Sequence, residues 1–200
     1  MTAFILSGIL NNTILIHNSG HKSHQQGIAS NLGRIKFRGP SFQSFFMTVE
    51  EEEQQVKSIE SFTDFGLDER LLRVLTRQGI AKPTLIQEKA IPLALSGKDI
   101  LAKARTGSGK TLAYLLPSLH QLLQQRSLSS SGCVSILILV PTKELSRQVT
   151  LCVKELLEFC ELNVLNLSTD DLVQVHKRSL VELEPAILVS TPSRLCSFLD

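Results

Sequence analysis

Acidic residues are missing from the first quarter of this 200-residue chain: residues 1–49 contain no Asp or Glu but four basic side chains. The remainder carries 17 basic and 19 acidic residues, a net charge of −2, against +2 for the whole chain. A balance this close to zero does not by itself attract nucleic acid. Any nucleic-acid surface on the globular part must therefore be local.

Three further absences limit the class of protein. The cysteines Cys133, Cys152, Cys160 and Cys196 form no CxxC pair and no metal-ligand spacing, which favours free, buried thiols in a reducing compartment. No apolar run approaches the ~18 residues that a membrane span needs, so no membrane partner is expected. The apolar start lacks a basic segment and a cleavage site, which argues against a secretory signal.

Residues 1–60 are predicted to be an N-terminal extension. Residues 1–46 are rich in Ser, Asn, Gly and His without sustained periodicity, which predicts a mostly disordered stretch. Its acid-poor, serine-containing composition also suits an organelle transit peptide. Alternatively Met47 is the natural start and residues 1–46 are non-native or isoform-specific. The ordinary charged run Glu50–Glu53 favours this second interpretation.

From residue 61 onward, helical and strand patterns alternate. Helices are predicted at 68–78, 84–97, from the loop after strand 100–103 to about 125, at 143–160, at 171–183 and from 194. Strands are predicted at 100–103, 134–140, 163–167 and 186–190, the second of them buried on both faces. Strands that alternate with helices predict an α/β fold with a parallel sheet and flanking helices.

A phosphate-binding loop follows the first of these strands. It comprises Ala104, Arg105, Thr106, Gly107, Ser108, Gly109, Lys110 and Thr111. Backbone N–H groups at 107–111 converge on phosphate at a helix N-terminus. Lys110 would reach the β- and γ-phosphates and Thr111 would coordinate Mg²⁺, so these two are the candidate catalytic residues and ATP the expected cofactor. The alternative is a glycine-rich turn that binds nothing, which leaves Lys110 and Thr111 unexplained.

The segment Gly79-Ile-Ala-Lys-Pro-Thr-Leu-Ile-Gln87 resembles the Q motif of the DEAD-box RNA helicases, with Phe62 seventeen residues before Gly79. A Gln amide both donates and accepts, so Gln87 can pair with adenine, and Phe62 offers a stacking face. The resemblance implies that Phe62, Lys82, Thr84 and Gln87 bind the nucleotide and select ATP over GTP. The alternative is a Gln on a helix surface and a core Phe.

Two later loops also resemble motifs of this family. Pro141-Thr-Lys-Glu-Leu145 resembles motif Ia and Thr191-Pro-Ser-Arg194 resembles motif Ib, with substitutions at Lys143 and Ser193. The resemblance implies contacts to the RNA backbone. The residues concerned are Pro141, Thr142, Lys143, Thr191, Pro192 and Arg194. The family's Gly-Gly segment should fall near 168–171, where Asp170 and Asp171 would instead repel phosphate.

The resemblance covers residues 61–199, with a Q-motif region at 61–89 and a RecA-like ATP-binding domain at 90–200. It implies the first lobe of an ATP-dependent RNA helicase, closest to the nucleolar subfamily that assembles large ribosomal subunits. Expected partners are RNA and pre-ribosomal particles, in the nucleus and nucleolus, or in an organelle if residues 1–46 are a transit peptide.

The family's Asp-Glu-Ala-Asp segment, Ser-Ala-Thr motif and second lobe are not found within these 200 residues. We therefore expect an N-terminal fragment with an incomplete first lobe and little ATP hydrolysis, since that step needs the missing groups. The alternatives are a catalytically inactive isoform, or a gene fragment, that binds nucleotide or RNA weakly. A P-loop ATPase unrelated to RNA is disfavoured by the other three motifs.

Overall fold

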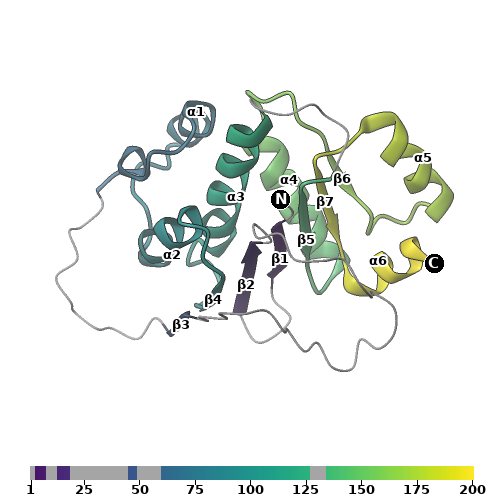
Figure 1. Cartoon of the computed structure of the whole chain (residues 1–200), viewed down its shortest axis with the longest axis horizontal. Helices are drawn as coiled ribbons and strands as arrows, with labels where there is room; N and C mark the ends of the chain where they lie inside the picture. The colour runs from purple at the N-terminus through teal and green to yellow at the C-terminus, as the bar shows by residue number, and fades with distance from the viewer. Residues whose placement is uncertain (1–2, 8–12, 19–44, 49–59, 127–133) are drawn as a thin grey trace.

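Short apolar and β-branched runs form the strands, as their composition favours. The computed structural model describes residues 3–7, 13–18, 45–48, 60–126 and 134–200. Its strands are β1 (Ala3–Ser7), β2 (Thr13–Asn18), β3 (Phe45–Thr48), β4 (Ile100–Lys103), β5 (Ile136–Leu139), β6 (Val164–Asn166) and β7 (Ile187–Ser190). They form one sheet in the order β3-β4-β2-β1-β5-β7-β6 (Figure 1).

The sheet is parallel except at β2. This strand runs antiparallel to both of its neighbours, β1 and β4, whereas the pairs β1–β5, β3–β4, β5–β7 and β6–β7 are parallel. Only five residues separate β1 from β2. A connection this short joins antiparallel strands, because a parallel pair needs a crossover of a dozen or more residues.

The N-terminal strands differ from the expected disorder of residues 1–46. β1 pairs with β5 on one side and with β2 on the other, and β2 pairs with β4. The runs at 4–6 and 14–16 are continuously apolar, and runs of this kind are typical of strands in the centre of a sheet. Composition averaged over the whole segment concealed them. Met47, the alternative start, lies inside β3.

The helices begin and end close to their predicted limits. They are the 3₁₀ helix η1 (Phe62–Phe65), α1 (Glu69–Arg77), α2 (Leu85–Leu95), α3 (Lys110–Arg126), α4 (Lys143–Leu156), α5 (Val173–Leu183) and α6 (Pro192–Leu199). Asp68 caps α1 by accepting a hydrogen bond from the Arg70 N–H, and Gly79 follows its end at φ 71°. The last helix starts at Pro192 rather than Arg194, because proline suits the first helical turn.

Two hydrophobic clusters lie on opposite faces of the sheet. The larger one packs α1–α4 against alternate strand residues such as Ile136 and Ile138. The smaller one includes Leu188 and Phe198, with Leu137 packed against it, and lies under α5 and α6. In Figure 1 these two helices stand together at the β6–β7 end of the sheet. β7 is buried along its whole length, whereas β5 alternates between buried and half-buried positions.

The thiols agree with the sequence expectation as far as the structure describes them. Cys152, Cys160 and Cys196 are free and half-buried, and Cys133 lies outside the described residues. Burial raises the pKa of Cys152 to about 11, so this thiol is protonated at neutral pH. Among the described helices, none has the length and hydrophobicity to cross a membrane.

Candidate functional site

The loop between β4 and α3 folds around its own lysine. Lys110 Nζ donates hydrogen bonds to the carbonyl oxygens of Ala104, at 2.6 Å, and Arg105. Gly107 and Gly109 have φ values of 77° and 90°, a left-handed conformation that residues with a Cβ rarely adopt. Burial lowers the pKa of Lys110. The loop is therefore a preformed cradle with the ammonium group inside it.

Residues at the start of α2 form hydrogen bonds to this loop. The Gln87 amide accepts from Thr84 N at 2.8 Å and donates from Nε2 to the Gly109 carbonyl at 3.0 Å. Thr84 Oγ1 donates to the Ser108 carbonyl at 2.8 Å. Gln87 is only 2% exposed. The Q-like segment and the phosphate loop are thus joined by hydrogen bonds between residues 22 and 24 positions apart, and we call this hydrogen-bonded unit the loop brace.

Two side chains expected to read the base are placed differently. Phe62 is 3% exposed and packs near Phe65, with ring centroids 6.0 Å apart. The Phe62 ring therefore lies in the core cluster, and its stacking on the base stays a prediction. Gln87 uses its amide oxygen and one of its two N–H donors within the protein. Lys82 is exposed in the turn before α2.

The loop fits a phosphate group. Among the described residues, Ser108 Oγ is buried and has no hydrogen-bond partner, as expected for a group that awaits a polar ligand. Thr111 lies half-buried in the first turn of α3, next to Lys110. No cluster of three His, Cys, Asp or Glu side chains that could hold a metal occurs in the described part of the chain. Thr111 is the residue predicted to hold a divalent cation.

Replacing the two loop glycines by alanine is expected to have unequal effects on thermal stability. A Cβ on Gly107 meets nothing within 4 Å, whereas one on Gly109 would lie 2.5 Å from Gln87 Nε2 and 2.9 Å from Thr84 Oγ1. Gly107→Ala costs only the backbone strain, about 1–2 kcal/mol. Gly109→Ala adds the broken loop brace, about 1 kcal/mol for each lost hydrogen bond. Thermal unfolding measures both variants, and equal losses in Tm would contradict the brace.

The loops after β5 and β7 carry the residues expected to contact RNA. Thr142 caps α4, its Oγ1 accepting from Leu145 N at 3.2 Å, and Pro141, Thr142 and Lys143 are exposed. Lys143 Nζ pairs with Asp170 at 2.5 Å, and Arg147 reaches the same carboxylate at 3.5 Å. The pKa of Asp170 is lowered, mainly by the hydrogen bond from Lys143.

The loop after β7 is more enclosed than expected. Thr191 is 8% exposed, its N–H donates to Ser168 Oγ at 2.7 Å, and its Oγ1 accepts from the same hydroxyl at 3.3 Å. The Thr191 hydroxyl thus has a partner within the protein, and its contact to phosphate stays a prediction. Pro192 begins α6. Arg194 is half-buried and donates from Nε to the Leu167 carbonyl at 2.9 Å.

Sequence reasoning missed Arg147 and His176. Arg147 lies four residues after Lys143 and hence on the same face of α4, a spacing that could have been noticed. His176, on α5, is 3% exposed and bonded to both Thr169 and Arg194. No sequence signal predicts that contact, because α5 and α6 meet only through the fold.

The loops that follow β4, β5, β6 and β7 lie at one edge of the sheet. These four strands run in the same direction, and each loop follows the carboxyl end of its strand. They are not adjacent, however. β2 and β1 stand between β4 and β5, so about 14 Å separates these strands at the usual strand spacing. The phosphate loop and the Lys143 loop therefore lie at the same edge of the sheet but at separate positions along it.

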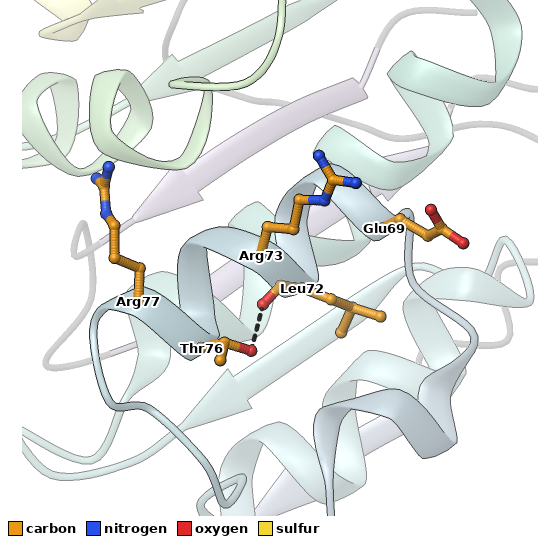
Figure 2. Close-up of a pocket in the computed structure, with 5 residues that line it drawn as sticks. All are labelled: Glu69, Leu72, Arg73, Thr76 and Arg77. Carbon is orange, nitrogen blue, oxygen red and sulfur yellow. Dashed lines mark hydrogen bonds between the residues drawn. The ribbon is translucent and has the colours of Figure 1, made fainter.

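A hollow on the surface of α1 lies apart from this edge. Figure 2 shows its lining side chains, Glu69, Leu72, Arg73, Thr76 and Arg77, spaced along one face of the helix. The Thr76 hydroxyl donates to the Leu72 carbonyl at 2.9 Å, and Arg77 pairs with Glu158 on the neighbouring chain segment. None of the residues predicted to bind nucleotide or RNA lines this hollow.

Known proteins share both the sequence and the fold. A family model described as DEAD/DEAH box helicase matches residues 84–200. The ATP-dependent RNA helicase dbp9 of Botryotinia fuckeliana is 48% identical over 141 residues, which make up 70% of this chain and 23% of that relative. The chain thus spans about a quarter of this relative's length.

Two solved structures resemble this fold. The RNA helicase Prp28 from Chaetomium thermophilum, bound to ADP, has a TM-score of 0.60 and 33% identity over 70% of this chain and 34% of its own. Mss116p, bound to ssRNA and AMP-PNP, has a TM-score of 0.66 and 27% identity over 74% of this chain and 31% of its own. These matches confirm the predicted RecA-like fold. Because the family model covers more than half of its residues, the chain belongs to the DEAD/DEAH box helicase family.

Proposed function

We propose that this chain is the ATP-binding and RNA-contacting N-terminal part of an ATP-dependent RNA helicase. The observation that carries the proposal is the lysine-filled cradle at the same sheet edge as three cationic side chains. The names of the relatives support it, as do the ADP and ssRNA bound to the two similar structures. The resemblance of the sequence to the nucleolar subfamily extends the proposal to a role in ribosome biogenesis, with pre-ribosomal particles as partners and the nucleolus as location.

The phosphate loop and the loop brace would bind the nucleotide. The N–H groups at 107–111 would bind phosphate oxygens, and Lys110 would exchange its two carbonyl partners for the β- and γ-phosphates. Thr111 would hold Mg²⁺, which supplies charge stabilisation to the phosphates. Gln87 would read adenine by releasing its bond to Gly109. This release would couple adenine recognition to the phosphate loop, because the Gln87 amide takes part in both contacts.

The RNA role falls to charges on the loops after β5 and β7. Lys143 and Arg147 are exposed, with relative side-chain exposures of 58% and 51%, and Arg194 lies at the start of α6. Contacts from these groups would go to phosphates, which fix position without reading sequence. Asp170 competes for two of them, since its carboxylate already pairs with Lys143 and Arg147. RNA must displace this carboxylate.

Changes to the Lys143–Asp170 pair should shift RNA affinity in opposite directions. Lys143→Ala removes a phosphate contact, so binding should weaken and the salt dependence should become shallower by about one ion. Asp170→Asn frees both cations, so binding should tighten by about 2- to 5-fold, the modest gain expected from removing an exposed ion pair. Fluorescence anisotropy with single-stranded oligouridine at several salt concentrations measures both.

The matched control is Glu161→Gln. It makes the same change in net charge at an exposed position before β6, at the other edge of the sheet. An affinity gain in Asp170→Asn no larger than that in Glu161→Gln would mean that only the overall charge matters. An unchanged affinity in Lys143→Ala would remove this loop from the RNA surface.

A further inference from the structure

His176 belongs to a closed ring of hydrogen bonds around Arg194. Its Nδ1 lies 3.2 Å from Arg194 Nη2, and its Nε2 lies 2.7 Å from Thr169 Oγ1. Thr169 Oγ1 donates in turn to Asp171 Oδ2 at 2.7 Å. The ring closes because Arg194 Nη2 also donates to the Asp171 carbonyl. The turn after β6, α5 that follows it and the more distant α6 thus meet at one imidazole.

The ring has one consistent set of protons. A guanidinium group only donates, so Nδ1 of His176 must be the bare, accepting nitrogen. The proton of the neutral imidazole is therefore on Nε2 and is donated to Thr169 Oγ1. That hydroxyl has a single proton, which goes to the Asp171 carboxylate. Each donor in the ring is matched to an acceptor only while His176 is neutral.

The ring leaves one end of Arg194 available. Nε donates to the Leu167 carbonyl and Nη2 donates to the Asp171 carbonyl and to His176. These bonds use three of the five guanidinium donors. The two donors on Nη1 make no hydrogen bond to the residues that the structure describes. A clamped guanidinium with a free Nη1 is a fixed donor for an anionic oxygen.

We propose that neutral His176 is a positioning residue, which holds the Arg194 guanidinium so that Nη1 faces an RNA phosphate. The inference rests on the RNA contact proposed above for Arg194. Without the imidazole, Arg194 keeps its two backbone acceptors but loses the buried one that fixes the plane of its Nη2 end. Each phosphate contact then has an entropic cost, since the Arg194 guanidinium must become ordered when RNA binds.

Acid should break the ring. The charged groups facing His176 are Arg194 from α6 and Asp171 from the preceding turn, whose carboxylate is 3.8 Å away; on its own helix, Lys177 lies over the Phe198 ring and Arg178 pairs with Glu182. Burial first, and Arg194 second, lower the pKa of His176 below 6.5, against the opposing effect of Asp171. Positioning is therefore complete at neutral pH and is lost as the pH falls below 6.5 towards that lowered pKa.

Two substitutions separate positioning from packing. In His176→Asn the amide oxygen replaces Nδ1 as acceptor, whereas in His176→Gln the amide instead reaches the place of Nε2. We expect oligouridine affinity within about 2-fold of wild type for His176→Asn and about 3- to 10-fold weaker for His176→Gln, as for loss of one charge-assisted contact. As the pH is lowered from about 7.5 through the lowered pKa of His176, wild type should lose affinity relative to His176→Asn, which cannot titrate.

The control is Arg194→Ala. If it weakens RNA binding while His176→Gln equals wild type and the wild-type and His176→Asn pH profiles coincide, the positioning role is overturned and the proposed function stands. If neither Arg194→Ala nor Lys143→Ala weakens binding, the proposed RNA surface itself is wrong. Should His176→Gln fail to fold by circular dichroism, the pH profiles of wild type and His176→Asn decide, since parallel profiles overturn the proposal.

Discussion

Lys110→Ala is expected to reduce ATP affinity by at least about 50-fold, the loss of two charge-assisted hydrogen bonds to phosphate. The structure adds a second reason: Lys110 Nζ also donates hydrogen bonds to the carbonyls of Ala104 and Arg105 within the loop. Removing it takes away the ligand contact and the internal tie that shapes the cradle. Isothermal titration with Mg²⁺-ATP measures the effect.

Lys98→Ala is the matched control, since Lys98 is exposed in the turn before β4. It should bind ATP like the wild type. A Lys110→Ala affinity within about 3-fold of the control would rule out the cradle as the phosphate site, because one charge-assisted contact alone exceeds that difference.

The same titration separates two roles of Gln87. Gln87→Ala removes the bond to the Gly109 carbonyl, so affinity for any nucleoside triphosphate should fall through loosening of the loop. If the amide also reads adenine, ATP should lose more than GTP and the preference for ATP should shrink. An unchanged ratio of ATP to GTP affinity would restrict Gln87 to the loop brace.

Deleting residues 1–46 should destabilise the domain severely. The deletion removes β1, β2 and half of β3, and β4 pairs with β5 only through the two lost strands. The sheet would be split into β3–β4 and β5–β7–β6, with new unpaired edges that favour aggregation. We expect Tm to fall by more than about 10 °C, the size expected for a loss of several kcal/mol in a domain of this length.

A point variant tests the same pairing without shortening the chain. Ile5→Pro removes a ladder hydrogen bond in β1, which pairs on both sides, and proline is tolerated only at sheet edges. Gly27→Pro, between β2 and β3 in sequence, is the control. Unchanged melting of both the deletion and Ile5→Pro would show that the domain folds without these strands. That result would favour Met47 as the natural start.

Local chemistry made much of this molecule readable from sequence. Asp68 and Gly79 limit α1 because capping and left-handed φ depend on neighbouring residues alone. The phosphate loop adopts positive φ values at Gly107 and Gly109, which glycine permits at no steric cost. The strand at 100–103 was predicted with its observed limits. Pattern alone failed for β1 and β2, which pair with each other but whose other partners, β5 and β4, are more than eighty residues away along the chain.

By itself, the sequence determined the cradle, the helix limits and the alternation of strands and helices, since each depends on residues a few positions apart. Tertiary structure alone decided the strand order, and with it the distance between the nucleotide loop and the cationic loops. It also buried Phe62, tied Gln87 to Gly109 and brought His176 to Arg194. These outcomes have the same physical reason. They depend on which groups far apart in sequence pack together away from water and form hydrogen bonds with each other.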